Sequence, residues 1–270
     1  MGLRIMTWNL WWRFGPQWRA RQAAIAHTLR AVDPDVVALQ EVWGTDATTQ
    51  AHELARPPGL HAAFTPTSLP PAPVPPEHPD QDGVRVGLGL LSRWPITRWR
   101  AVPMPARYRD TAPTTLLAEL AHPDGPLRVA VTCLEWEPEF DADRHAQAEA
   151  LAAVATDPAL DGPLPVLVAG DLNAAPDSPV LRPLNAVLTD AWTAGGGDPA
   201  AVTLSSAHPH APLEAAELID QRIDHVLVRP GRPGQRVSVG RAELAGHPVD
   251  GLDPSDHLAV VCDLEWSAPG

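Results

Sequence analysis

The chain is short of cysteine and has no long apolar run, and both shortages limit what it can be. Its two cysteines, Cys133 and Cys262, lie far apart in apolar segments, which does not fit a disulfide framework and fits a reducing compartment. No run of about 18 apolar residues suggests a transmembrane helix. Residues 1–10 have the pattern of a strand rather than of a signal peptide. We expect a cytoplasmic protein that does not insert into membranes, and we expect a monomer.

Positive charge is also scarce. The 20 Lys and Arg residues face 33 Asp and Glu residues, and the formal net charge is −13. Because non-specific nucleic-acid binding depends on neutralising phosphates with Lys and Arg, this balance argues against long polyanions. A bound metal or a local arginine cluster could still reverse the field at one site. Arg13, Arg19 and Arg21 form such a cluster, which is either a phosphate clamp or the solvated face of a helix.

Proline, by contrast, is abundant, with 32 residues. Because proline cannot donate to a strand ladder or continue a helix, these residues are expected in loops and at strand edges. Residues 65–82 are dominated by proline and show no periodicity, which predicts a long loop. Two interpretations stay open for it: a disordered insertion, or a loop that faces the substrate.

The apolar pattern predicts more strands than helices. Strands are expected over residues 3–10, 36–42, 84–92, 96–104, 114–121, 126–134, 165–169, 222–228, 236–244 and 258–265. Helices are expected over residues 18–33, 48–56, 141–156 and 179–187. Hairpins are mixed with strand-helix-strand segments, which favours an α/β fold of two packed sheets with helices outside. No linker divides the chain, so we expect one domain over residues 1–270.

Polar residues stand at the ends of several apolar strands, where the pattern alone would not place them. They are Asn9, Glu41, Asp171, Asn173, Asp224, Asp256 and His257. One such residue is usually a turn residue or a helix cap, but several together suggest a site. Hard oxygen ligands suit Mg²⁺, with Mn²⁺ as an alternative. A zinc-site spacing, a phosphate-binding Gly-rich loop and a nucleophile elbow are all absent from the sequence.

The order of these residues resembles a known family. The motifs are Trp8-Asn9, Gln40-Glu41, Gly170-Asp171-Leu172-Asn173, Arg222-Ile223-Asp224 and Ser255-Asp256-His257, with the run from Gly87 to Arg93 between them. They resemble the ordered motifs of the endonuclease/exonuclease/phosphatase superfamily, which has the deoxyribonuclease I-like fold. The resemblance implies a four-layered α/β sandwich, two packed mixed sheets flanked by helices, with the active site at one end.

The resemblance also implies roles. Glu41, helped by Asn9 and completed by Asp256, would bind Mg²⁺. Asp171 would orient or deprotonate the attacking water. Asn173 would donate to a phosphoryl oxygen, and so would His257, which Asp224 would orient. Water would then attack phosphorus in line, without a covalent intermediate.

One position departs from the family pattern. Many members have a histidine after threonine at the end of a central strand, whereas this chain has Cys133 after Thr132. Cys133 is either a small buried residue that continues the face of Val129 and Val131, or a thiol that reaches the substrate. Arg144 or His145, from the next helix, could supply the missing cation.

Two loops supply further candidates for substrate binding. His208 resembles a position in the family's loop before Asp224, although exposed loop histidines are common. Trp11 follows Asn9 and could stack on a base, a sugar or a lipid headgroup, with core packing as the alternative.

The sequence therefore predicts an Mg²⁺-dependent hydrolase of a small-molecule, sugar or inositol, or lipid-headgroup phosphoester. A DNA or RNA nuclease is the alternative, since nucleic acid is not excluded as a partner. A non-catalytic binding protein on the same fold is a third hypothesis, which only the Cys133 departure supports.

Overall fold

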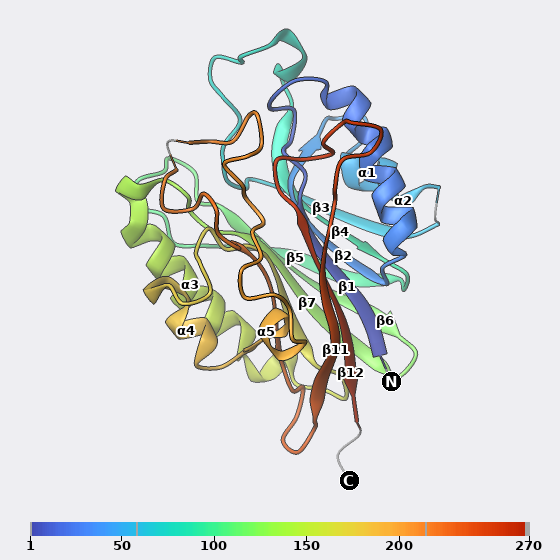
Figure 1. The fold of residues 1–270 in the computed structure, drawn as a ribbon. Helices are drawn as coiled ribbons and strands as arrows, with labels where there is room; N and C mark the ends of the chain where they lie inside the picture. Colours follow the sequence, from blue (N-terminus) through green and yellow to red (C-terminus); the bar gives the residue numbers. More distant parts are fainter. Residues whose placement is uncertain (1, 58, 214, 268–270) are drawn as a thin grey trace.

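The computed structural model describes residues 2–57, 59–213 and 215–267, and Figure 1 shows the fold. Within this part of the chain, two sheets of six strands pack face to face. The first sheet consists of β1 (Gly2–Asn9), β2 (Val36–Gly44), β3 (His61–Pro66), β4 (Arg85–Ser92), β11 (Val237–Ala245) and β12 (Ala259–Trp266). The second consists of β5 (Ile96–Pro103), β6 (Thr114–His122), β7 (Gly125–Cys133), β8 (Val166–Asp171), β9 (Thr189–Asp190) and β10 (Asp224–Arg229).

Both sheets are mixed. The strand orders are β11-β12-β1-β2-β4-β3 and β5-β6-β7-β8-β10-β9. In the first sheet β1 runs parallel to β2 and antiparallel to β12. In the second sheet β8 runs parallel to β7 and antiparallel to β10. Each sheet thus has a parallel pair at its centre, whose two strands end at the same edge.

Helices cover the outer faces of the two sheets (Figure 1). These helices are α1 (Trp18–Val32), α2 (Gln50–Ala55), α3 (Asp141–Ala155) and α4 (Arg182–Asn185). The short helix α5 (Ala191–Ala194) instead packs against the core between the sheets through Ala191 and Trp192. Apolar residues of α1 and α2 pack on the first sheet, and those of α3 and α4 pack on the second. This helix-sheet-sheet-helix arrangement confirms the predicted four-layered sandwich. None of the described helices is long and apolar enough to span a membrane.

The alternation of side chains along β1 shows how the sequence builds these layers. Leu3 and Ile5 point into the core between the two sheets, whereas Met6 and Trp8 point toward the helices. Successive side chains of a strand face opposite sides of its sheet, so a strand that is covered on both sides is apolar throughout. Full burial of each large apolar side chain contributes about 1.5–3 kcal/mol.

Three short elements are missing from the predicted pattern: β3, β9 and α5. β3 lies at the edge of its sheet and ends at Pro66, where a proline is tolerated because no further strand needs its N–H. Residues 65 and 66, predicted to open the proline-rich loop, therefore belong to β3. Residues 67–78 contain neither helix nor strand, and a short 3₁₀ helix, Pro79–Gln81, follows.

Candidate active site

The site lies where the central strands end, at the edge of the sandwich opposite the start of β1 and the end of β12 (Figure 1). Asn9 is the last residue of β1, and Asp171 is the last residue of β8. In the second sheet, Asp171 pairs in register with Cys133 of β7 on one side and Asp224 of β10 on the other. Strand pairing alone therefore brings Cys133, Asp171 and Asp224 together.

The same alternation that builds the core aims these side chains between the sheets. Ala169 of β8 and Val226 of β10 lie in the core between the sheets. Asp171 and Asp224 are two positions from them along their strands, so they face the same side. Asn9 stands four positions after Ile5 and faces inward for the same reason. The polar site is thus a continuation of the inter-sheet core at its open end.

Glu41 reaches the site by a different route. Ala38 faces inward, so regular alternation would place Gln40, and not Glu41, on the inner face. The register of β2 with β4 shifts between Leu39 and Val42, and Glu41 has a φ of 50°. Such a bulge re-aims a side chain, and a positive φ outside glycine costs on the order of 1–3 kcal/mol. The chain bears this cost where Glu41 turns into the site.

Asn9 joins the two sheets through its side-chain amide. Its Nδ2 donates to Oε1 of Glu41 at 2.7 Å and to Oδ2 of Asp171 at 3.2 Å. Its Oδ1 accepts the backbone N–H of Trp11 at 2.9 Å. Asn9 thus orients the two carboxylates, and Oδ1, which accepts one N–H, keeps a second lone pair.

Three aspartates surround the imidazole of His257. Its Nδ1 lies 2.9 Å from Oδ2 of Asp224, and its Nε2 lies 4.0 Å from Oδ2 of Asp171. Burial alone would lower the pKa of His257, but Asp224, Asp256 and Asp171 together raise it well above its usual range. The backbone N–H of His257 donates to Oγ of Ser255, which itself donates to the carbonyl of Asn9 at 2.6 Å.

The carboxylates carry more negative charge than the protein neutralises. Burial, followed by the charge of Asp256, raises the pKa of Glu41 to about 8. Burial and the charge of Asp224 raise the pKa of Asp171 to about 7. Burial also raises the pKa of Asp256. These directions show a buried cluster that would be stabilised by an added positive charge.

A divalent cation fits this cluster at Glu41 and Asp256. Within the described residues, Oε2 of Glu41 is buried and has no hydrogen-bond partner. A buried, unpaired carboxylate oxygen beside a second carboxylate is the oxygen-rich environment that Mg²⁺ and Mn²⁺ prefer.

A second group is also tight enough for a metal, because the ligand atoms of Asp171, Asp224 and His257 lie within 4.8 Å of one another. Nδ1 of His257 and Oδ2 of Asp224 are already paired at 2.9 Å, however, whereas Oε2 of Glu41 has no hydrogen-bond partner among the described residues. The unpaired oxygen therefore favours Glu41, with Asp256 beside it, as the place where a cation fits.

Asn173 occupies a strained turn directly after β8, with a φ of 46°. Its backbone N–H donates to Oδ1 of Asp171, and its Nδ2 donates to the carbonyl of Leu134 at 2.9 Å. The carbonyl of Asn173 accepts Nη1 of Arg144 at 3.0 Å. Arg144 thus fixes the turn from behind.

The structure does not bring the two cations of α3 to the face where substrate would bind. The remaining donors of Arg144 go to Asp141. His145 is exposed and lies 3.5 Å from Asp141. Neither residue lines the pocket described next.

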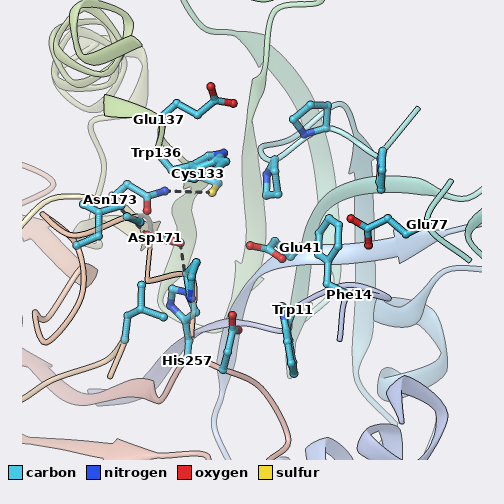
Figure 2. A pocket seen from close by; sticks show the side chains of 18 of the residues that line it. Trp11, Phe14, Glu41, Glu77, Cys133, Trp136, Glu137, Asp171, Asn173 and His257 are labelled. Atoms are coloured by element: carbon cyan, nitrogen blue, oxygen red, sulfur yellow. Dashed lines mark hydrogen bonds and ion pairs between the residues drawn. The ribbon is translucent and has the colours of Figure 1, made fainter. Parts of the chain in front are cut away.

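A pocket of about 490 Å³ opens above these groups. Figure 2 shows Asp171, Asn173, Cys133 and His257 on one side, with Glu41 facing them from the other. The lining residues are Trp11, Phe14, Glu41, Pro70, Pro71, Pro73, Glu77, Arg109, Cys133, Trp136, Glu137, Asp171, Asn173, Leu204, Pro212, Ala215, Leu218, Asp256 and His257. Three prolines of the 65–82 segment are among them, which favours the interpretation that this loop faces the substrate.

The other candidates fall at different distances from the pocket. Trp11 lines it, and His208 packs edge-on against Trp11 with ring centroids 5.4 Å apart. His208 itself is not part of the lining, and its Nε2 lies 3.8 Å from Asp253. Cys133 lines the pocket and continues the inward face of β7, and burial raises the pKa of its thiol well above the usual range. Cys133 is therefore neutral and supplies no cation.

The N-terminal arginines do not form a phosphate clamp. Arg21 is buried and donates to the backbone carbonyls of Leu10, Trp11, Trp12 and Phe14. Arg19 pairs with Asp80, and the guanidinium of Arg13 stacks over Trp18. These arginines shape the loop after β1 and tie it to the proline-rich loop.

Sequence reasoning missed four lining residues with large side chains: Phe14, Arg109, Trp136 and Glu137. Trp136 and Glu137 lie three and four residues after the end of β7, so the rule that strand ends carry the site could have found them. Phe14 and Arg109 lie in loops without a periodic pattern, and no local signal marks them.

Fold and site together define a class of protein: a metal-dependent hydrolase with its carboxylates and histidine at the open end of an α/β sandwich. The family model described as "Endonuclease/Exonuclease/phosphatase family" matches residues 6–257. The chain therefore belongs to this family, whose members are metal-dependent phosphodiesterases, nucleases and phosphatases.

Several solved structures share the fold. An endonuclease/exonuclease/phosphatase from Beutenbergia cavernae DSM 12333 has 24% identity and a TM-score of 0.71, covering 99% of this chain and 72% of that one. The human Nocturnin catalytic domain, solved with a bound sulfate anion, has 21% identity and a TM-score of 0.71, covering 98% and 95%. D. rerio TDP2, solved with a single-strand DNA product, has 18% identity and a TM-score of 0.73, covering 98% and 99%. A search of curated proteins finds no match.

Proposed function

We propose that this hydrolase cleaves a small phosphoester by in-line attack of water on phosphorus, with Mg²⁺ as its metal. One observation carries the proposal. Asn9 connects Glu41 to Asp171 by hydrogen bonds, and the Asp224–His257 pair stands beside them at the same pocket. Carboxylates, an amide and a histidine cation in this arrangement can bind, activate and stabilise the groups of a phosphoryl transfer.

Glu41 and Asp256 would hold the Mg²⁺, and Asn9 would keep the Glu41 carboxylate in its orientation. When bound, the cation would polarise the phosphoryl group and offset the negative charge of its oxygens.

The residues on the opposite side of the pocket would handle the water and the phosphate. Asp171, with a pKa of about 7, would accept the proton of the attacking water. His257 would donate from Nε2 to a phosphoryl oxygen, because its Nδ1 is fixed by Asp224. Asn173 donates from Nδ2 to the carbonyl of Leu134 and makes a long contact of 4.0 Å with the sulfur of Cys133, and a phosphoryl oxygen would replace that sulfur as the second acceptor.

The lining of the pocket supports a small substrate over a polynucleotide. Five carboxylates line it, and Arg109 is the one arginine among the described lining residues. A chain of several phosphates would be repelled there, whereas one phosphate beside a bound cation would not. Trp11, Phe14 and Trp136 offer flat apolar walls to the rest of the ester. A sugar or inositol phosphate or a lipid headgroup fits this description.

A nuclease is the second candidate. The tryptophans of the pocket could also stack on bases, and a structure of similar fold, that of D. rerio TDP2, holds a single-strand DNA product. Binding of single-stranded DNA that weakens steeply with salt would favour this candidate.

We further propose that the protein is cytoplasmic and acts as a monomer. Both cysteines are buried and unpaired, which supports a reducing compartment.

The test is hydrolysis of bis-p-nitrophenyl phosphate and p-nitrophenyl phosphate with Mg²⁺ or Mn²⁺, beside nicking of plasmid DNA. Asp171→Asn should lower kcat roughly 10²- to 10⁴-fold without unfolding the protein, because it removes the proton acceptor. Asp177→Asn is the matched control, since Asp177 is exposed in the loop that follows. Substantial activity in Asp171→Asn would rule out the assigned role, and nicking that depends on Asp171 would favour the nuclease.

A further inference from the structure

Arg109 stands out among the residues of the pocket. It lies in the loop between β5 and β6, far in sequence from every strand-end motif. The other charged lining residues are Glu41, Glu77, Glu137, Asp171, Asp256 and His257. An anionic substrate that enters this pocket therefore meets one guanidinium among several carboxylates.

Two carboxylates fix the guanidinium of Arg109. Glu135, which is fully buried, accepts from Nε at 2.9 Å and from Nη2 at 2.7 Å. Glu137 also accepts from Nη2, at 2.8 Å. The guanidinium carbon lies 4.7 Å from the ring centroid of Phe140. The hydrogen bonds to Glu135 are the largest influence on the pKa of Arg109 and raise it, so the side chain stays charged.

The loop that carries Arg109 is itself tied to α3. The backbone N–H groups of Arg107 and Tyr108 donate to Oδ2 of Asp143, at 2.7 and 3.1 Å. Gln147 donates to the carbonyl of Pro105 and accepts the backbone N–H of Glu135. One helix thus positions both the arginine loop and the segment that bears its carboxylate partner, so no rearrangement is needed for Arg109 to act.

One nitrogen of this guanidinium is left over. Within the described residues, Nη1 of Arg109 makes no hydrogen bond, although Nε and Nη2 make three between them. The side chain is 15% exposed, and the residue belongs to the pocket lining. If Arg109 served only to neutralise Glu135, it would not need to line a substrate pocket with one nitrogen unpaired.

We propose that Arg109 is a substrate-binding residue whose Nη1 donates to an anionic oxygen of the phosphoester, while Glu135 holds the guanidinium in place through two hydrogen bonds. The inference rests on the proposed function for the identity of the anion. It also limits the substrate, because one guanidinium with one free donor group can contact a single phosphate.

The experiment measures the affinity of inorganic phosphate, by calorimetry and as competitive inhibition of p-nitrophenyl phosphate hydrolysis. Arg109→Gln should weaken phosphate binding roughly 10- to 100-fold, as expected for the loss of a charge-assisted hydrogen bond. Arg107→Gln is the matched control, because Arg107 is exposed two positions earlier in the same loop. A folded Arg109→Gln protein with the phosphate affinity of Arg107→Gln would overturn the proposal.

A second variant keeps the test decisive if Arg109→Gln does not fold. Glu137→Gln leaves the Arg109–Glu135 pair in place and removes a competing carboxylate from the pocket. It should strengthen phosphate binding several-fold, and more than Glu77→Gln, which removes a lining carboxylate that makes no hydrogen bond to Arg109. Equal effects of the two variants, or weaker binding in Glu137→Gln, would count against the inference. If the wild-type protein hydrolyses neither ester, the proposed function fails, but the dependence of phosphate affinity on Arg109 and Glu137 still decides this proposal.

Discussion

His225 lies behind the catalytic turn and holds it through a neutral imidazole. Its Nε2 is 2.9 Å from the carbonyl of Ala174, and its Nδ1 is 3.0 Å from Nη1 of Arg222. Because arginine can only donate, Nδ1 is the acceptor and Nε2 carries the proton. Burial and the neighbouring Arg222 lower the pKa of His225 to about 4. The turn after β8 therefore depends on a histidine that must stay uncharged.

This arrangement predicts a loss of stability in acid. Between about pH 6.5, the usual pKa of histidine, and pH 4, the unfolded chain binds a proton that folded His225 does not. The free energy of unfolding should fall as pH falls through this window, by on the order of 3 kcal/mol. In His225→Gln this contribution should vanish, so the pH dependence becomes shallower. Urea unfolding at several pH values measures both slopes, and equal slopes would contradict the assignment.

A site residue can be predicted from the sequence when the contacts that position it are close along the chain. Asp171 and Asp224 end or begin apolar strands, so a local pattern marks them and strand pairing does the rest. Arg109 is positioned by Glu135, 26 residues away, and no local pattern contains that contact. Arg144 is close in sequence to the site, but its direction is set by Asp141 and by the carbonyl of Asn173. The sequence therefore predicts which residues lie near the site better than it predicts the direction of their side chains.

At the scale of elements, the two loops around the pocket are joined by Asp80. Its Oδ2 accepts from Nε1 of Trp18 and from Nη1 of Arg19, and Gln81 donates to the carbonyl of Arg13. The same loop lines the pocket with Pro70, Pro71, Pro73 and Glu77. The tether therefore fixes one wall of the pocket to the start of α1.

Removing the contacts of Asp80 with Trp18 and Arg19 should weaken substrate binding without slowing the hydrolysis step. Asp80→Asn is expected to raise KM several-fold with little change in kcat, because the catalytic carboxylates lie elsewhere. Stability should hardly change, since ion pairs near the surface contribute about 0–1 kcal/mol. Steady-state kinetics beside a thermal melt measures both, with Asp82→Asn as the control because Asp82 is exposed in the same loop. A change confined to kcat would show that the loop does not act through binding.

The longer elements could be predicted because each carries its own periodicity, and the shortest could not. β9 has two residues, which is too few for any alternation to appear. The bulge at Glu41 is a different case, because the sequence marked Glu41 as a strand-end residue while the structure shows that it lies inside β2. Pairing with β4 creates the bulge, and pairing partners are not encoded locally.

For the whole molecule, the sandwich followed from the count of strands and from the order of the motifs. Buried carboxylates gather at the open end of the sandwich, so a cation that binds there would bind the native state only. A ligand that binds only the native state raises its stability. Mg²⁺ should raise the melting temperature of the wild-type protein. Glu41→Gln should abolish this increase, and without metal it should be at least as stable as the wild type, because it buries an amide beside Asp256 in place of a carboxylate.

Thermal unfolding with a chelator and with excess Mg²⁺ tests this prediction. Asp46→Asn serves as the control, since its carboxylate is fully exposed just beyond β2. A Glu41→Gln protein that Mg²⁺ stabilises as much as the wild type would place the cation elsewhere.

The pairing of β1 with β12 also determines when, during translation, the proposed site can be completed. Asn9 and Glu41 leave the ribosome early, but Asp256 and His257 come just before β12, which must lie beside β1. At about 5–20 residues per second, translation separates these events by tens of seconds or so. Throughout that interval the nascent chain lacks both Asp256 and His257, and with them half of the proposed metal site and the histidine of the pocket. The proposed site is therefore complete only when β12 has been made and has paired with β1.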